Sequence, residues 1–184
     1  MSGPDMMNVP LLFACAALLA LERVCYAWAW FHTRSFRAFC AAGPMSSIGE
    51  PPEVLERLFY GFKLLQVSVF IVWCLVHGDG QLWPIHSPPA AVALGALVLT
   101  IGQTLNLLVF SRLGRSGVFY GCRFGRNVPW VEEFPFSLIK HPQYVGAVLS
   151  IWGLFLILRF PADDWAVLPL VQTVYYVIGA HCES

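Results

Sequence analysis

Five long apolar runs constrain this chain of 184 residues more than any other feature of its sequence. A membrane-spanning helix needs about 20 mostly apolar residues, and each run approaches or reaches that length. The runs cover residues 9–30, 58–76, 90–110, 145–160 and 165–180. Only Pro161-Ala162-Asp163-Asp164 separates the last two, and such a segment is typical of a turn, so these two runs predict a helical hairpin. We therefore expect an all-α polytopic membrane protein with four to five membrane helices.

The composition argues against several other classes of protein. The chain is 58% hydrophobic and 12% charged, with a formal net charge of zero, whereas a soluble domain carries about 25% charged residues. These values argue against a soluble enzyme and against a disordered protein, and the lack of a basic surplus argues against a nucleic-acid partner. No pair of the six cysteines has CxxC spacing, so neither a zinc site nor a redox motif is indicated. We expect a single domain over residues 1–184 that binds no metal.

Basic residues are concentrated in two of the stretches between the runs. They are Arg34, Arg37 and Arg57 in the first stretch, and Arg112, Arg115, Arg123, Arg126 and Lys140 in the second. The stretch 77–89 contains no lysine or arginine. Because basic loops stay on the cytosolic side of a membrane, we expect both basic stretches and Glu183 to face the cytosol.

Glu22 and Arg23 fall late in the first apolar run. Charged side chains within a membrane helix are costly, and long ones extend toward the interface. We therefore expect this pair at the membrane interface, with contact to a lipid headgroup as the alternative. The first run then either crosses the membrane or lies in it without fully crossing.

The stretch 111–144 is unusually long for a loop in a chain that is otherwise mostly apolar runs. Loops longer than about 15 residues are usually functional or disordered, and the many aromatic residues here argue against disorder. Glycine recurs every three to four residues, at Gly114, Gly117, Gly121 and Gly125. This spacing suits either close helix packing or tight turns around a ligand. Pro142 suits the first turn of the fourth helix, whose free N–H groups near His141 and Tyr144 would favour an anion.

Several motifs in this half of the chain resemble the phospholipid N-methyltransferase family. They read Gly117-Val118-Phe119-Tyr120-Gly121-Cys122-Arg123-Phe124-Gly125, Val128-Pro129-Trp130-Val131, Glu133-Phe134-Pro135-Phe136 and His141-Pro142-Gln143-Tyr144-Val145-Gly146. The small plant-type members are the most similar, and the animal phosphatidylethanolamine N-methyltransferases are more distant. The shorter His-Pro-x-Tyr-x-Gly element also occurs in isoprenylcysteine carboxyl methyltransferases. The resemblance covers roughly residues 95–183.

The resemblance implies methyl transfer from S-adenosylmethionine to the headgroup amine of phosphatidylethanolamine-type lipids. It favours the mono- and dimethylated lipids as substrates, phosphatidylcholine as product, and the endoplasmic reticulum membrane as location. It also implies N-terminal membrane segments over 1–88 and a cofactor and catalytic part over 89–184, with the long loop as a cytosolic catalytic loop.

The resemblance also assigns cofactor-binding residues. The family's Gly-x-Gly element corresponds to Thr100-Ile101-Gly102, and its acidic pair after the last apolar run corresponds to Cys182-Glu183. The predicted cofactor-binding residues are Thr100, Ile101, Gly102, Gln103, Pro142, Gly146, Cys182 and Glu183.

The chemistry of methyl transfer assigns the candidate catalytic residues. The attacking amine must be neutral, so a proton acceptor or a desolvated pocket is needed. His141 is the candidate base by its intrinsic pKa, with Glu133 and Glu183 as alternatives and Tyr144 beside it in the motif. Glu183 could instead hold the ribose hydroxyls or the ammonium of the cofactor.

The candidate substrate-binding residues are each open to a second interpretation. Arg123 and Arg126 suit a clamp on the lipid phosphate, or general contact with anionic lipid. An aromatic wall for a methylated ammonium would use Tyr120, Trp130 and Tyr144, which otherwise suit the membrane interface. Gln103 and Asn106 lie in the third run, where intramembrane amides either line a site or join helices.

Two other functions compete with this one. A carboxyl methyltransferase acting on prenylated cysteine shares the chemistry, but its acceptor has no phosphate to explain two arginines. A non-enzymatic membrane scaffold or small transporter predicts no S-adenosylmethionine binding and leaves the aromatic, glycine-rich loop unexplained.

Overall fold

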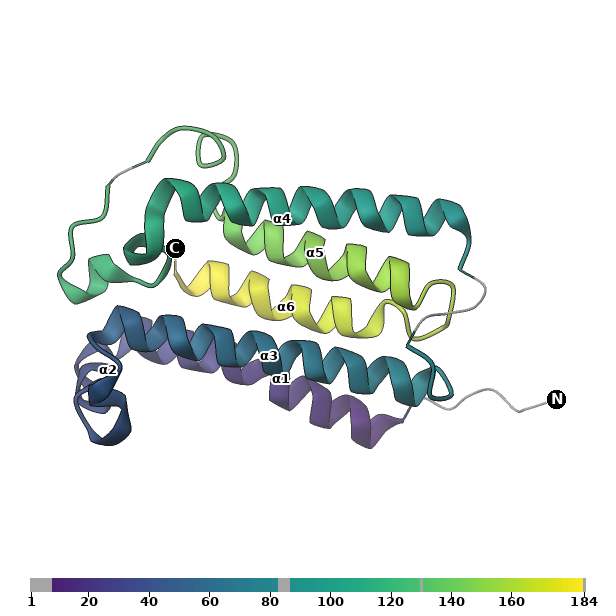
Figure 1. The fold of residues 1–184 in the computed structure, drawn as a ribbon, viewed down its shortest axis with the longest axis horizontal. Coiled ribbons are helices and arrows are strands. Elements are labelled where there is room, and N and C mark those ends of the chain that lie inside the picture. The colour runs from purple at the N-terminus through teal and green to yellow at the C-terminus, as the bar shows by residue number, and fades with distance from the viewer. Residues whose placement is uncertain (1–7, 83–86, 130, 184) are drawn as a thin grey trace.

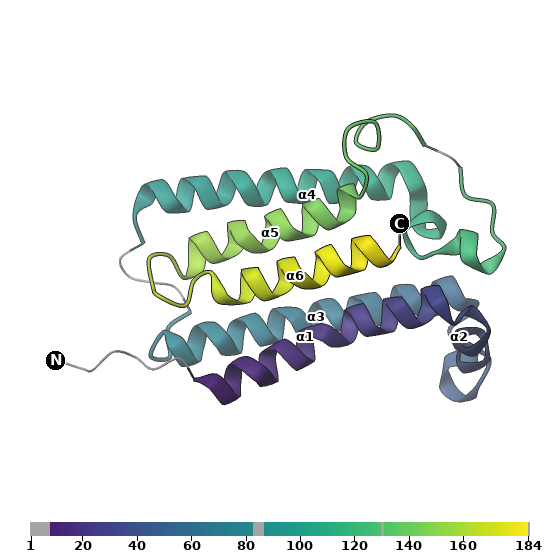
Figure 2. The same cartoon turned by 180° about the vertical axis from the view of Figure 1, so that it is seen from behind.

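A computed structural model describes residues 8–82, 87–129 and 131–183, and this part of the chain is helical, without strands. Five long helices and three short ones follow one another along it. They are α1 (Val9–Phe31), α2 (Thr33–Cys40), η1 (Gly43–Ser47), α3 (Pro51–His77), α4 (Pro89–Val118), η2 (Gly121–Phe124), α5 (Pro142–Leu158) and α6 (Val167–Cys182). Figure 1 shows the long helices side by side, with α4, α5 and α6 on one side and α1 and α3 on the other. The view from behind gives the same two groups (Figure 2).

Capping residues and prolines explain where most of the long helices begin. The side-chain oxygen of Asn8 accepts a hydrogen bond from the N–H of Leu11 at 3.1 Å and so caps α1. Proline occupies the first turn of three of the other long helices, at Pro51, Pro89 and Pro142. At this position proline costs nothing, because its missing N–H has no partner within a helix.

The helices have the lengths and surfaces of a membrane protein. Within the described residues, α1, α3 and α4 are long and apolar enough to cross a membrane, and α5 and α6 are apolar but shorter, with 17 and 16 residues. Large apolar side chains such as Leu64 and Leu107 are 72% and 70% exposed, which suits contact with lipid rather than water. The prediction of an all-α polytopic membrane protein that ends in a helical hairpin is confirmed.

Two long helices extend well beyond the residues expected, and one short helix is additional. The second long helix begins at Pro51 rather than at residue 58. α4 continues to Val118, so the first part of the predicted loop is helical, with a bend at Gly114, where φ is 62°. The short helix α2 was not expected, because its apolar side covers only two buried residues, Phe36 and Cys40.

Glycines bring α4 and α5 unusually close together. A Cβ atom on Gly102 would lie 2.6 Å from the backbone oxygen of Gly146, and one on Gly153 would lie 2.6 Å from that of Gly95. Real Cβ atoms do not come this close to backbone, so only glycine permits the two helices to approach in this way. Close packing at glycines therefore joins α4 and α5.

A substitution at this contact should destabilise the protein. We expect Gly102→Ala to lower its stability by about 1–3 kcal/mol, because the added methyl group must push α4 and α5 apart. Gly61→Ala is the matched control: it lies on α3, its Cβ would meet no atom within 4 Å, and alanine favours a helix by up to about 1 kcal/mol. Thermal unfolding in detergent measures both. Equal unfolding temperatures for the two variants would argue against the close contact.

A buried polar group joins the helices at the end of the bundle where α3 ends and α4 begins (Figure 1). Trp73 donates from Nε1 to Oδ2 of Asp164 at 2.7 Å, and Arg159 donates from Nε to the same oxygen at 3.0 Å. Arg159 also donates from Nη2 to the backbone oxygen of His77 at 2.8 Å. Because Arg159 and Asp164 are buried, this group ties the α5–α6 connection to the end of α3.

Candidate active site

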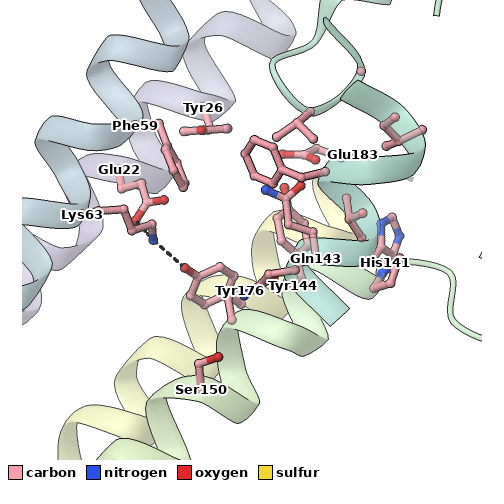
Figure 3. A pocket seen from close by; sticks show the side chains of 18 of the residues that line it. Glu22, Tyr26, Phe59, Lys63, His141, Gln143, Tyr144, Ser150, Tyr176 and Glu183 are labelled. Carbon is pink, nitrogen blue, oxygen red and sulfur yellow. Dashed lines mark hydrogen bonds and ion pairs between the residues drawn. The ribbon is translucent and has the colours of Figure 1, made fainter. Parts of the chain in front are cut away.

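A cavity of about 490 Å³ lies between the α1–α3 pair and the α4–α6 group, and we call it the central cavity. All five long helices contribute to its lining, as do Tyr120 and the segment before α5. Figure 3 shows Glu22 and Lys63 on one side of this cavity and His141 on the other, with Tyr144 and Glu183 between them. The cavity therefore brings together polar side chains that are far apart in the sequence.

Four of the predicted site residues line one part of the central cavity: Tyr120, His141, Tyr144 and Glu183. The hydroxyl of Tyr120 donates a short hydrogen bond to Oε1 of Glu183, the residue that ends α6. The imidazole of His141 stacks on the ring of Tyr144, with ring centroids 5.9 Å apart and planes inclined by 18°. The start of α5, the end of α6 and the segment between α4 and η2 thus place a carboxylate, an imidazole and two phenol groups around one space.

The surroundings of His141 favour its neutral form. Burial lowers the pKa of its imidazole from the ordinary value, and the positive charge of Lys140 lowers it further, whereas Glu183 acts in the opposite direction. A neutral imidazole is the form that can accept a proton.

A buried group of charged residues faces these side chains across the cavity, and we call Glu22, Arg23 and Lys63 the charged cluster. The carboxylate of Glu22 accepts from Nη2 of Arg23 at 2.6 Å and from Nζ of Lys63 at 3.0 Å. Lys63 also donates to Oε1 of Gln66 and to the hydroxyl oxygen of Tyr176, both at 3.1 Å. Glu22 is only 5% exposed, so this carboxylate is enclosed by the helices, and the depth of the pair in the membrane stays a prediction.

The physical reason for this burial is pairing between helices. Taken alone, α1 carries two adjacent charges in an apolar run, and exposure at the interface is then the less costly solution. In the fold, Lys63 of α3 faces Glu22, and the pair can be buried because its charges and hydrogen bonds are matched. The sequence shows a lysine in one apolar run and a glutamate in another, but it does not show that they face each other.

The rings of Tyr26, Tyr144 and Tyr176 surround the guanidinium of Arg23. The Cζ atom of Arg23 lies 4.9, 5.3 and 4.5 Å from the centroids of these three rings, respectively. Such distances are those of cation–π contacts. Sequence reasoning expected an aromatic wall near the site and included Tyr144, but it missed Tyr26 and Tyr176.

The predicted cofactor residues of α4 point in two directions. Gln103 and Asn106 line the central cavity. Gln103 donates from Nε2 to Oγ of Ser150 at 2.9 Å, whereas Oδ1 of Asn106 is buried without a hydrogen-bond partner among the described residues. Thr100 and Ile101 are exposed and lie outside the lining, and the hydroxyl of Thr100 donates to Ala96 of its own helix at 2.7 Å.

The other predicted cofactor residues lie at or near the cavity wall. Pro142 lines the central cavity, and Gly102 and Gly146 pack against each other next to it. A Cβ atom on Gly146 would lie 2.6 Å from Oδ1 of Asn106, so the absence of a side chain there makes room for this amide. Cys182 is exposed near the end of α6 and is not part of the lining of the central cavity.

The structure does not bring the predicted arginine pair to the central cavity. Arg126 makes a two-pronged contact with Glu53, Nη1–Oε1 at 2.6 Å and Nη2–Oε2 at 2.8 Å. The guanidinium of Arg123 lies over the ring of Trp30, with its Cζ atom 3.8 Å from the ring centroid.

Of two further predicted residues, one lies outside the cavity and the other lies outside the described residues. Glu133, the alternative base, is exposed and pairs with Arg112, with Oε2 and Nη1 2.6 Å apart. Trp130 lies outside the described residues.

Comparison with known proteins agrees with the motifs. The family model described as phospholipid methyltransferase matches residues 90–184. A protein of Arabidopsis thaliana named phosphatidyl-N-methylethanolamine N-methyltransferase is 36% identical over 127 residues, which are 68% of this chain and 67% of that protein. Human phosphatidylethanolamine N-methyltransferase is 38% identical over 66 residues, which are 35% of this chain and only 33% of the human protein. No solved structure matches the chain significantly.

The fold and the matches together define a membrane-embedded methyltransferase. The chain belongs to the phospholipid methyltransferase family, and the resemblance seen in its motifs is confirmed.

Proposed function

We propose that this protein transfers methyl groups from S-adenosylmethionine to the headgroup amine of phosphatidylethanolamine-type lipids. Its preferred acceptors are phosphatidyl-N-methylethanolamine and phosphatidyl-N,N-dimethylethanolamine, and the final product is phosphatidylcholine. The observation that carries the proposal is the central cavity, where a carboxylate, an imidazole and phenol groups meet within a bundle of apolar helices. The name of the Arabidopsis relative, phosphatidyl-N-methylethanolamine N-methyltransferase, supports the choice of acceptor.

The residues around Glu183 fit S-adenosylmethionine, whose bound form supplies an electrophilic methyl group. An ionised carboxylate suits the cofactor's hydroxyl or ammonium groups. Asn106 offers a buried oxygen that no described residue satisfies, and an amide oxygen in this state favours a ligand with N–H or O–H donors. We assign Glu183, Asn106 and Gln103 to cofactor binding, and we assign Gly102 and Gly146 to the packing that positions Asn106.

His141 is the proposed base for the lipid amine. An ammonium group must lose its proton before nitrogen can attack carbon, and a neutral imidazole is able to take that proton. Tyr144 stacks on the imidazole and fixes its plane. The cavity lining would hold amine and methyl donor close together and apart from water, and such positioning supplies much of the rate in a displacement of this kind.

The whole chain forms the proposed methyltransferase domain. Residues 89–184 supply the cofactor and catalytic residues, and residues 1–88 complete the cavity with Glu22, Arg23 and Lys63. The short helices α2 and η2 lie with the end of α6 at one end of the bundle (Figure 1). Because the basic stretches belong to this end, we propose that it faces the cytosol, with the endoplasmic reticulum as the location.

A panel of methyl acceptors tests this proposal with the purified protein and methyl-labelled S-adenosylmethionine. We expect label in phosphatidyl-N-methylethanolamine and its dimethylated form, and none in a prenylated cysteine. Label only in the prenylated cysteine would favour the carboxyl methyltransferase alternative. Cofactor that neither binds nor transfers its methyl group would contradict both enzymatic functions and leave the scaffold or transporter.

Loss of the negative charge at Glu183 should weaken cofactor binding. We expect Glu183→Gln to raise the dissociation constant of S-adenosylhomocysteine about 10- to 100-fold, because hydrogen bonds to a charged group contribute about 1.5–3 kcal/mol. The KM for the lipid should stay within about twofold. Isothermal titration in detergent gives the first quantity and a methyl-transfer assay the second.

Glu132→Gln is the control for Glu183→Gln, because Glu132 is an exposed acid outside the lining of the central cavity. It should leave cofactor affinity unchanged. Unchanged affinity in Glu183→Gln itself would show that Glu183 is not a cofactor ligand.

A further inference from the structure

We propose that Arg23 and Lys63 of the charged cluster bind the phosphodiester of the lipid substrate. This inference rests on the proposed function and adds the part of the cavity that recognises the lipid headgroup. The cluster has an unbalanced charge, unsatisfied donors and a position near His141.

The cavity carries more positive than negative charge. Its lining contains three cationic side chains, Arg23, Lys63 and Lys140, against two carboxylates, Glu22 and Glu183. Glu22 accepts hydrogen bonds from both Arg23 and Lys63, so one carboxylate serves two cations. An unbalanced charge in an apolar bundle is costly, and an anionic ligand would restore the balance.

The donors that such a ligand needs are present. Nε and Nη1 of Arg23 and Nε2 of Gln66 are buried without hydrogen-bond partners among the described residues. A buried donor left unsatisfied costs about 1–3 kcal/mol, so three of them in one place indicate a missing acceptor. The planar donor array of arginine matches the oxygens of a phosphate.

The surroundings favour a lipid as the source of the phosphate. The lining of the central cavity includes Leu107 of α4, which is 70% exposed on the apolar outer surface. A lipid can therefore place its headgroup in the cavity while its chains remain in the membrane. Lys63 is twelve residues into α3, about 18 Å along the helix from its start, so the charged cluster lies within an apolar bundle, where an amphiphile can reach it.

The distance to the proposed base also fits one headgroup. Arg23 lies 5.3 Å from the ring of Tyr144, measured from its Cζ atom, and the same ring stacks on His141 with centroids 5.9 Å apart. One aromatic ring therefore separates the guanidinium of Arg23 from the imidazole. A phosphoethanolamine headgroup, whose phosphate and amine are joined by an ethylene bridge, can contact both at once.

The test compares two methyl acceptors that differ in the phosphate alone. One is phosphatidyl-N-methylethanolamine, and the other is an N-methylaminoethyl ether of diacylglycerol, which has the amine and the chains but no phosphate. We expect wild-type protein in detergent micelles to prefer the phospholipid by about tenfold or more in kcat/KM. Arg23→Gln should raise the KM for the phospholipid about 10- to 100-fold and abolish this preference, because charge-assisted hydrogen bonds to phosphate are lost.

Two further variants keep the test decisive. Arg23→Lys retains the charge and should lose part of the preference, and Lys63→Gln should reduce it even if Arg23→Gln fails to fold. Arg115→Gln is the control, since Arg115 is a highly exposed partner of Glu56 outside the central cavity. It should keep the wild-type preference.

The outcomes distinguish a lipid phosphate from the cofactor's carboxylate as the bound anion. They also distinguish failure of this inference from failure of the proposed function. A preserved preference in folded Arg23→Gln, together with weaker binding of S-adenosylmethionine, would assign the site to the cofactor's carboxylate and overturn the proposal. A preserved preference with unchanged cofactor affinity would also overturn it. If wild-type protein methylates neither acceptor, the proposed function itself fails.

Discussion

His141→Gln is expected to lower kcat by about 10²- to 10⁴-fold, which is the usual contribution of a positioned general base. The variant should also lose one feature of the pH profile. In the wild-type protein, burial and Lys140 lower the pKa of His141, so the fraction of neutral imidazole rises with pH through a midpoint below the ordinary value of about 6.5. Activity should rise in the same range, because only the neutral form accepts a proton. Initial rates of methyl transfer between about pH 5 and pH 8 measure both effects.

The control for this prediction is His181→Gln. His181 is exposed in the last turn of α6 and does not line the central cavity, so its variant should keep the wild-type rate and pH profile. An acidic limb that persists in His141→Gln, or a loss of kcat smaller than about tenfold, would assign the base to another group.

Asp164→Ala is expected to lower the free energy of unfolding by about 3–5 kcal/mol. The substitution leaves the buried guanidinium of Arg159 without its carboxylate and removes the acceptor of Trp73 Nε1. Breaking such a pair by removing one partner is far more damaging than losing an exposed ion pair. Thermal or denaturant unfolding in detergent measures the loss.

The neighbouring residue provides a matched control, because Asp163 is exposed whereas Asp164 is buried. Asp163→Ala should change stability by less than about 0.5 kcal/mol, as is usual for surface substitutions. Similar losses in the two variants would show that the Arg159–Asp164 pair does not join α3 to the hairpin.

The arrangement of the helices could be predicted largely from hydropathy. Runs of apolar residues and the Pro161–Asp164 segment predicted the five long helices and the hairpin, because chain segments in a membrane must satisfy their backbone hydrogen bonds internally. The helix ends could be predicted less accurately from the sequence. α3 and α4 extend beyond their apolar runs into polar sequence, where hydropathy gives no signal but the helix continues.

The candidate site was predictable where residues lie in one motif and unpredictable where separate helices meet. His141 and Tyr144 are neighbours in sequence, and Glu183 followed from the family's pattern, so sequence reasoning placed all three together. The charged cluster depends on which faces of α1, α3 and α6 come together. No single apolar run shows which helix faces meet. Lys63 lies near the start of the run 58–76, but its helix begins at Pro51, so Lys63 is twelve residues into α3.

Arg126 illustrates the opposite error of interpretation. Its place in the motif suggested contact with lipid phosphate, but the start of α3 presents Glu53 to it, and the two side chains form a two-pronged pair. Sequence reasoning could not anticipate this competitor because Glu53 lies 73 residues earlier in the chain.

The central claim is that cofactor and lipid meet in the central cavity, and a structure of the protein with S-adenosylhomocysteine and a phospholipid tests it most directly. We expect S-adenosylhomocysteine to lie in this cavity, with a polar atom within hydrogen-bond distance of Glu183, and the lipid phosphate to contact Arg23. S-adenosylhomocysteine bound instead on the outer face of α4, beside Thr100 and Ile101, would contradict the account.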